Sequence, residues 1–167
     1  MTNGASGEID FNADIGESFA GYELGLDSEI VKHITSANIA TGFHAGDPDW
    51  MARTVSLAIE NSVGVGAHPA YPDLTGFGRR KMDLTSDEVR NVVTYQVGAL
   101  AAFTPDRKLQ HVKPHGALYN TAVGDAAVAE AIVTAIKAFD PDLIHVVLAG
   151  SQWELIARSH GVRVARE

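Results

Sequence analysis

The chain of 167 residues contains no cysteine, which excludes disulfide bonds, thiolate catalysis and cysteine-based zinc sites. It also lacks any apolar run long enough to cross a bilayer. The first residues, 1–7, have no basic and apolar signal-peptide pattern, and we interpret them as a loose tail. The sequence therefore predicts a cytoplasmic protein without membrane segments.

Positive charge is scarce: 13 Lys and Arg stand against 21 Asp and Glu, and the formal net charge is −8. Nucleic acids and anionic membrane surfaces bind basic surfaces, so neither is an expected partner. A local exception is the basic run Arg79-Arg80-Lys81. The Gly- and Lys-containing phosphate-binding loop of many ATPases is also missing. If the protein uses ATP, it does so without this signature.

Apolar periodicity predicts a single α/β domain over residues 1–167, in which strands and helices alternate. We expect strands at 9–15, 36–41, 63–67, 110–113, 143–148 and 162–165, and helices at 27–34, 48–59, 85–100, 125–139 and 151–160. Six strands that alternate with helices predict a parallel sheet. An open doubly wound sheet and an incomplete β/α barrel both fit this pattern, and an exposed last strand would favour association into a homo-oligomer.

The most informative segment is His111-Val112-Lys113-Pro114-His115, at the end of a predicted strand. Side chains alternate across a strand, so His111, Lys113 and His115 point the same way. Three titratable groups on one face make a poor core and indicate an active site.

Comparable groups follow the other predicted strands. Asp14 and Glu17 follow the first, His44 follows the second, and His68 follows the third. In parallel α/β folds, functional groups lie at the carboxyl ends of the strands. Asn12 shares a strand face with Asp14, and this polar face predicts either a crevice or a solvated edge strand.

A metal site is the main alternative, because Asp14, His44, His68 and His115 include ligand types of a catalytic zinc. The sequence has no compact His pair on a helix, since Pro114 argues against a helix between His111 and His115. We therefore favour a site without a tightly bound metal.

Five segments resemble the LamB/YcsF lactam-utilisation family. They are IDFNADIGE at 9–17, SANIATGFHAGDP at 36–48, GAHPAYPD at 66–73, GFGRR at 76–80 and HVKPHGALYN at 111–120. The resemblance implies an irregular parallel β/α barrel of the glycoside hydrolase/deacetylase type, incomplete at the C-terminus because family members continue beyond Glu167. It also implies ATP-coupled opening of 5-oxo-L-proline to L-glutamate together with subunits B and C. Thr41 departs from the family's usual Cys, and Ala70 from a common Gly.

On this basis we expect an ATP-hydrolysing 5-oxoprolinase subunit, with Mg²⁺ as the counter-ion of ATP. Asp14 is the expected general base, His44, His68 and His115 move protons or orient the ring, and Lys113 stabilises negative charge. The expected substrate-binding residues are Asn12, Glu17, Asn38, Arg79, Arg80, His111 and Tyr119. Two alternatives stay open: a metal-dependent deacetylase or amide hydrolase without ATP, and a non-catalytic substrate-binding subunit.

Overall fold

The computed structural model describes residues 9–167, so the predicted tail at 1–7 lies outside the described part of the chain. The strands are β1 (Asn12–Ile15), β2 (Ser36–Ala40), β3 (Gly64–His68), β4 (His111–Val112), β5 (Ile144–Val147) and β6 (Arg163–Arg166). The helices are α1 (Asp27–Ile30), a 3-10 turn η1 (Val31–His33), α2 (Pro48–Glu60), α3 (Ser86–Ala101), α4 (Gly116–Gly124), α5 (Ala126–Phe139) and α6 (Gln152–Ser159).

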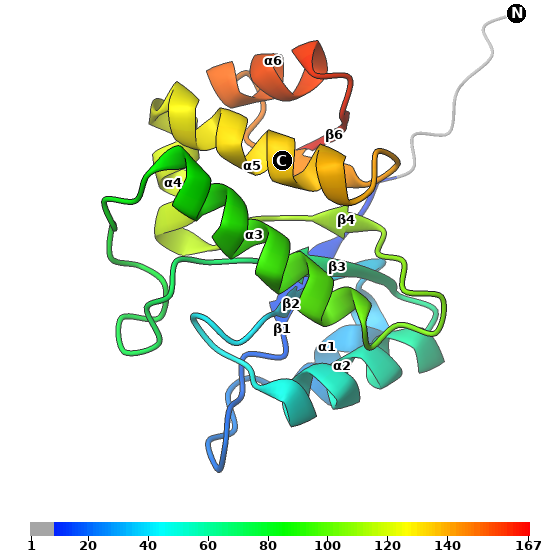
Figure 1. Cartoon of the computed structure of the whole chain (residues 1–167). Coiled ribbons are helices and arrows are strands. Elements are labelled where there is room, and N and C mark those ends of the chain that lie inside the picture. The colour runs from blue at the N-terminus through cyan, green and yellow to red at the C-terminus, as the bar shows by residue number, and fades with distance from the viewer. Residues whose placement is uncertain (1–8) are drawn as a thin grey trace, which may run out of the picture.

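The six strands form one parallel sheet whose spatial order, β1 to β6, is the order of the sequence (Figure 1). The predicted parallel α/β class is therefore confirmed. A doubly wound sheet reverses its strand order at a switch point, whereas a β/α barrel adds strands in sequence. The observed order is that of a barrel, and within residues 9–167 no pairing joins β1 to β6.

Most predicted boundaries differ from the structure by one or two residues, and three differences matter more. The first strand begins at Asn12 instead of Ile9, and Ile9 is 84% exposed. Strand β4 has only two residues, because Pro114 lacks the N–H that would continue the ladder. Helix α4 was not predicted at all: glycines at both of its ends resemble loop signals, and its short apolar stretch carries little periodicity.

The helix starts follow their capping signals. The Asp47 side chain accepts a hydrogen bond from the Trp50 N–H, with Pro48 in the first turn of α2. Thr85 and Glu88 form a capping box at the start of α3. Ser151 and Glu154 have the same spacing at the start of α6, but only half of a box forms: Ser151 caps the Glu154 N–H, while the Glu154 carboxylate accepts from the Gly150 N–H.

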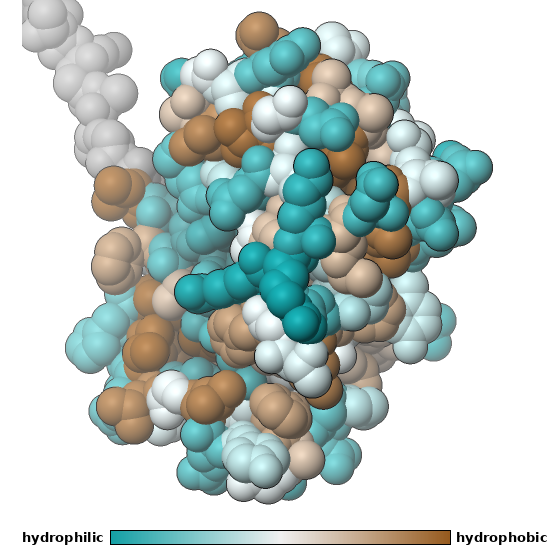
Figure 2. Space-filling model, turned by 90° about the vertical axis from the view of Figure 1, so that its left-hand side faces the viewer, coloured by the Kyte–Doolittle hydropathy of each residue, from teal (hydrophilic) through white to brown (hydrophobic). Residues whose placement is uncertain are grey.

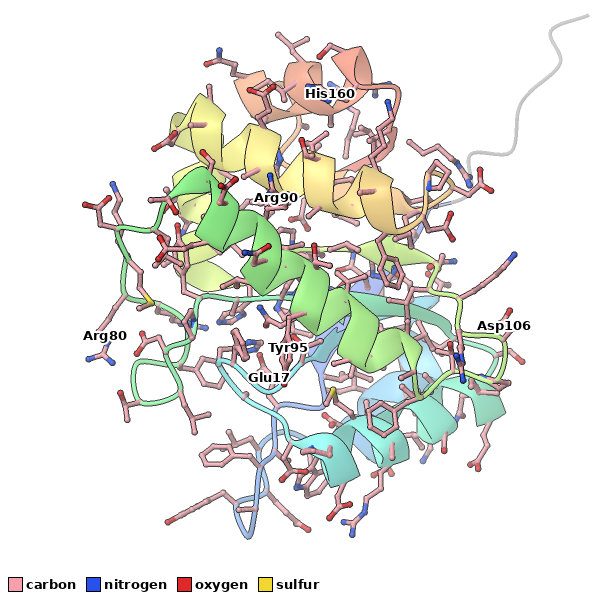
Figure 3. The ribbon with its side chains drawn as sticks, viewed as in Figure 1. Glu17, Arg80, Arg90, Tyr95, Asp106 and His160 are labelled. Atoms are coloured by element: carbon pink, nitrogen blue, oxygen red, sulfur yellow. The ribbon has the colours of Figure 1, made fainter. Side chains whose placement is uncertain are left out.

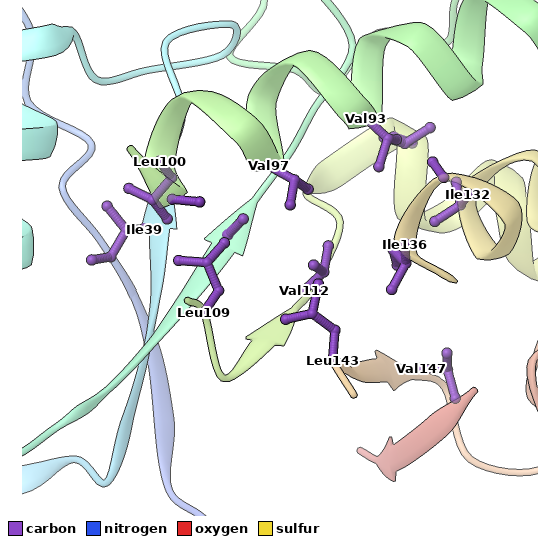
Figure 4. Close-up of a cluster of buried hydrophobic side chains, with 14 of the residues drawn as sticks. Ile39, Val93, Val97, Leu100, Leu109, Val112, Ile132, Ile136, Leu143 and Val147 are labelled. Atoms are coloured by element: carbon purple, nitrogen blue, oxygen red, sulfur yellow. The ribbon is translucent and has the colours of Figure 1, made fainter. Parts of the chain in front are cut away.

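The sheet has one apolar and one polar face, and the strand register determines which residues share each face. Ile15 pairs with Ile39, which pairs with Ala67, and this row packs into the apolar core. Helices α3 and α5 pack against each other in front of the sheet (Figure 1). Their buried side chains meet those of the strands (Figure 4): Ile39, Val93, Val97, Leu100, Leu109, Val112, Ile132, Ile136, Leu143 and Val147. Within residues 9–167, no helix has the length and apolar character that a membrane span needs.

His145 on β5 is fully buried on the core side, with its ring edge-to-face against Trp153 at 4.9 Å. Neither of its ring nitrogens has a hydrogen-bond partner in the described part of the chain. Burial lowers the pKa of His145 from the ordinary 6.5 to about 3, because the charged form cannot be solvated.

We expect this buried imidazole to make the fold sensitive to acid. The unfolded chain binds a proton near pH 6.5 and the folded chain does not, so its contribution to stability is complete above pH 6.5 and decreases as the pH falls towards 3. Between about pH 7 and about pH 5, the wild type should lose about 2 kcal/mol of unfolding free energy through this group, and His145→Leu should not show this loss. Urea unfolding at both pH values measures the difference. The exposed His33, changed to Gln, is the control, and an unchanged pH dependence in His145→Leu would contradict this account.

Candidate functional site

The candidate site lies at the carboxyl ends of β1 to β4, on the left of Figure 1. Seen from that side, hydrophilic side chains occupy the centre of the surface (Figure 2). An open cavity of about 330 Å³ lies here, which is the size of a small-molecule site. Its lining residues are Asp14, His68, Arg79, Lys113, Pro114, His115, Gly116, Ala117, Tyr119, Asn120 and Glu167.

Lys113 is the cation at the centre of this cavity. Its Nζ lies 3.1 Å from the Glu167 carboxylate, 3.6 Å from that of Asp14 and 3.4 Å from the Asn12 side-chain oxygen. The Lys113 side chain is 17% exposed, so the ammonium is mostly shielded from water yet open to a ligand. A partly desolvated cation of this kind can stabilise a developing oxyanion.

A row of in-register residues crosses the polar face of the sheet below the cavity. Asp14 pairs with Asn38, Asn38 with Gly66, and Gly66 with His111. Because Gly66 has no side chain, the His111 ring lies over it and its Nε2 reaches the Asn38 Oδ1 at 2.7 Å. The Asn38 amide in turn donates to Asp14 at 2.9 Å and to Asn12 at 2.7 Å. The burial of His111 lowers its pKa to about 4, so the ring is neutral and can fix the orientation of Asn38.

The Asp14 carboxylate is held in its ionised form. Burial opposes ionisation, but the hydrogen bond and charge of His68, the charge of Lys113 and the Asn38 amide outweigh it and hold the pKa of Asp14 well below its ordinary value. The side chain remains 40% exposed and faces the cavity. Asp14 can therefore contact a substrate as an anion.

His68 and His115 form a pair. In each ring, the nitrogen that points away from the other histidine (the outer nitrogen) lies within hydrogen-bond distance of a backbone carbonyl. His68 Nδ1 lies 2.6 Å from the Lys113 oxygen, and His115 Nε2 lies 2.9 Å from the Phe77 oxygen. A carbonyl can only accept, so both outer nitrogens are N–H donors. The inner nitrogens, His68 Nε2 and His115 Nδ1, lie 2.9 Å apart, and a hydrogen bond between them needs one more proton. Burial and the neighbouring His44 and His68 lower the pKa of His115 to about 4, so this extra proton is disfavoured near neutral pH.

His44 and Glu17 complete the cluster behind the cavity wall. The His44 ring stacks on that of His115 with centroids 3.8 Å apart, and its Nε2 lies 3.1 Å from Glu17 Oε1. Burial lowers the pKa of His44, although the Glu17 hydrogen bond opposes this shift. Gly78 packs on the same rings at a φ of +64°, where a Cβ would collide with His44 and His115. The loop after β3 therefore packs closely against the rings of these histidines.

The two arginines of that loop have different positions. Arg79 lines the cavity, with its guanidinium over the Phe77 ring at 5.5 Å. Arg80 instead pairs with Asp73 and Thr75 and points outward from the loop, whereas Glu17 lies in the interior (Figure 3). The Arg80 hydrogen bond lowers the pKa of Asp73 to about 2. Of the two candidates for holding a substrate carboxylate, only Arg79 is at the cavity.

Four of the five predicted catalytic residues therefore line the cavity, and His44 touches it through His115. Among the predicted substrate-binding residues, Arg79 and Tyr119 line it, whereas Glu17 lies behind the histidines and Arg80 lies outside. The other three form the polar row below: Asn12, Asn38 and His111.

Glu167 and Gln96 are among the residues at or near the site that were not predicted, as is Asn120 in the cavity wall. Glu167 lines the cavity, contacts Lys113 and raises the pKa of Tyr119 together with burial, which is the larger cause. Gln96 on α3 is fully buried, and its side chain holds Thr41 and both backbone groups of Ala70. Gln96 could have been found, because it lies on the buried stripe of its helix. Nothing in the sequence near Glu167 identifies it.

Comparison with known proteins identifies close relatives. A protein of Thermococcus onnurineus (strain NA1), named as the A subunit of 5-oxoprolinase, is 57% identical over 162 residues, which are 96% of this chain and 64% of that protein. The protein of the same name from Methylococcus capsulatus (strain ATCC 33009 / NCIMB 11132 / Bath) is 56% identical over 161 residues, or 95% of this chain and 62% of that protein. The chain spans less than two thirds of the length of these relatives.

A solved structure has the same fold. The crystal structure of the Lactam Utilization Protein from Thermus thermophilus superposes with a TM-score of 0.93 at 50% identity, covering 95% of this chain and 65% of that one. The model of the LamB/YcsF family matches residues 9–167, which is all of the described chain. This chain therefore belongs to the LamB/YcsF family.

Proposed function

We propose that the chain is the A component of an ATP-dependent 5-oxoprolinase that opens the ring of 5-oxo-L-proline to give L-glutamate. Its relatives at 53–57% identity are named as the A subunit of 5-oxoprolinase. The observation that carries the proposal is the cavity in which the Lys113 ammonium and the His68–His115 pair face the same space as Asp14 and Arg79. Such a set suits a small anionic substrate whose carbonyl becomes negatively charged.

The chemistry needs an outside source of energy, because the amide of a five-membered lactam is stabilised by resonance. In the proposed reaction, the lactam oxygen attacks the γ-phosphorus of ATP and ADP leaves. Water adds to the activated carbon, the C–N bond breaks and the nitrogen takes a proton, which leaves an acyl phosphate. A second water then releases phosphate and glutamate. The two waters balance the hydrolysis of ATP and of the amide.

Each cavity residue has a role in this scheme. Lys113 stabilises negative charge on the lactam or phosphoryl oxygens, and His68 and His115 move protons or orient the ring. The lowered pKa of Asp14 makes it a weaker base than the sequence suggested, so we assign it to hold Lys113 and to accept a hydrogen bond from the attacking water. Arg79 binds the substrate carboxylate, and Tyr119 forms part of the cavity wall beside Glu167.

ATP with Mg²⁺, subunits B and C and a cytoplasmic setting belong to the same proposal. The test is to purify the chain alone and together with B and C subunits of a close relative, and to measure glutamate and ADP released with 5-oxoproline. Turnover should need the partners. Binding of 5-oxoproline without turnover in any combination would favour the substrate-binding alternative, and neither binding nor turnover would reject the proposal.

The arginines provide a matched pair of variants. Arg79→Gln should raise the KM for 5-oxoproline by about 10-fold or more, with a smaller change in kcat, because a charge-assisted contact to the carboxylate is lost. Arg80→Gln removes the same charge one residue away, where it holds Asp73, and should change KM much less. Initial rates of the assembled complex over a range of substrate concentrations distinguish the two. Equal effects would argue against a carboxylate contact at Arg79.

A further inference from the structure

The geometry points to a transition-metal site formed by Glu17, His44, His68 and His115. One ligand atom from each of these residues lies within 4.8 Å of every other. Four ligands about 2.1 Å from one ion lie about 3.4 Å apart in a tetrahedron, so shifts of about an ångström bring this set to the dimensions of a metal site. Such a site would exist whether or not the proposed function holds.

The orientation of two histidines supports the site. Metal-binding histidines nearly always donate their other ring N–H to a carbonyl or carboxylate, which fixes the tautomer. His68 and His115 do this towards the Lys113 and Phe77 carbonyls, at 2.6 and 2.9 Å. The two inner nitrogens therefore face the same small space with their lone pairs, 2.9 Å apart. Since two ligands of one tetrahedral ion lie about 3.4 Å apart, the rings must separate by about half an ångström to bind it together.

The local charge also fits a dication. Glu17 Oε1 lies 3.1 Å from His44 Nε2 and 3.9 Å from His115 Nδ1, so it can bind the ion together with them. Asp14 adds a second carboxylate 3.4 Å from His68 Nε2. Both carboxylates therefore lie close enough to the histidine nitrogens to attract a cation there, although Asp14 also contacts Lys113.

The donor set selects the kind of metal. Three imidazole nitrogens and one carboxylate suit zinc, cobalt, manganese or iron(II), whereas Mg²⁺ and Ca²⁺ prefer oxygen ligands. Because the His44 and His115 rings now stack at an interplanar angle of 7°, the two rings must tilt apart when both bind one ion. The ion would then lie at the floor of the cavity, against His68 and His115, which line it.

Cobalt binding tests the site without any enzymatic assay. The full chain is treated with a chelator, and Co²⁺ is added while visible absorption is recorded. We expect d–d bands that saturate at one ion per chain, that excess Zn²⁺ removes and that excess Mg²⁺ leaves in place. Turnover is not measured, so a failure here leaves the proposed function standing.

Variants locate the ion. Glu17→Gln is the main variant, because its side chain is 21% exposed and the amide keeps its shape. It should weaken Co²⁺ binding by at least the roughly 10- to 100-fold that loss of an outer partner of a metal site costs. His68→Gln and His115→Gln should abolish the bands, and His33→Gln controls for exposed histidines. The absence of saturable bands in the wild type, or equal binding by wild type and Glu17→Gln, would overturn the inference.

Discussion

Lys113→Met is expected to reduce 5-oxoproline-dependent ATP hydrolysis by the complex with its partner subunits by about 100- to 1000-fold. The substitution keeps the length of the side chain but removes the ammonium that lies between Asp14 and Glu167. In the proposed reaction, the transition-state charge on the lactam oxygen would then lose the stabilising cation of Lys113. The expected loss is in kcat, since the cation acts most strongly when the charge develops.

The control for this variant is Lys108→Met, which removes an exposed lysine away from the cavity. Thermal unfolding of both proteins shows whether the fold is kept, and the rates of ADP and glutamate release are measured side by side. If the Lys113→Met complex kept more than about a third of the wild-type rate, Lys113 would have no role in stabilising this charge.

Asp14→Asn should have a comparable effect, a loss of about 10²- to 10⁴-fold in kcat. The amide preserves the shape and can still bond to Asn38, but it cannot balance the positive charge of Lys113. Because the pKa of Asp14 is far below its ordinary value, the acid limb of the wild-type pH–rate profile should not come from this carboxyl.

Asp142→Asn, at an exposed position remote from the cavity, is the matched control. Rates are compared over a range of pH for the wild type and both variants. Full activity of Asp14→Asn would mean that no charge at this position is needed, and it would leave Asp14 as a structural partner of Asn38.

The fold class could be predicted from the sequence because alternation and capping are local. Asp47-Pro48 and Thr85 begin helices where they were expected, and the strands differ by only a few residues. Helix α4 was missed because packing stabilises it: Leu118 and Ala122 are buried within a segment of weak periodicity.

The composition of the site could also be predicted, because parallel strands bring their carboxyl ends together. Asp14, His68, Lys113 and His115 meet for this reason. Which loop side chains turn inward could not be predicted. Arg79 and Arg80 are chemically identical neighbours, and only the Asp73 contact, made within the folded loop, separates them.

The tautomers of the site histidines could not be predicted from the sequence either. That the outer nitrogens of His68 and His115 are donors follows from the carbonyls of Lys113 and Phe77, whose directions depend on the tertiary structure. The same holds for His111, which reaches Asn38 only because Gly66 of the intervening strand leaves room for the ring.

The sequential strand order has a consequence for biosynthesis. Within residues 9–167, each strand pairs only with its predecessor and its successor along the chain, so a polypeptide that leaves the ribosome from its N-terminus always finds the previous strand already made. The charged groups that line the cavity, Glu167 excepted, come from strands β1 to β4 and the loops that follow them. The strands and loops that carry these groups are therefore synthesised before β5 and β6.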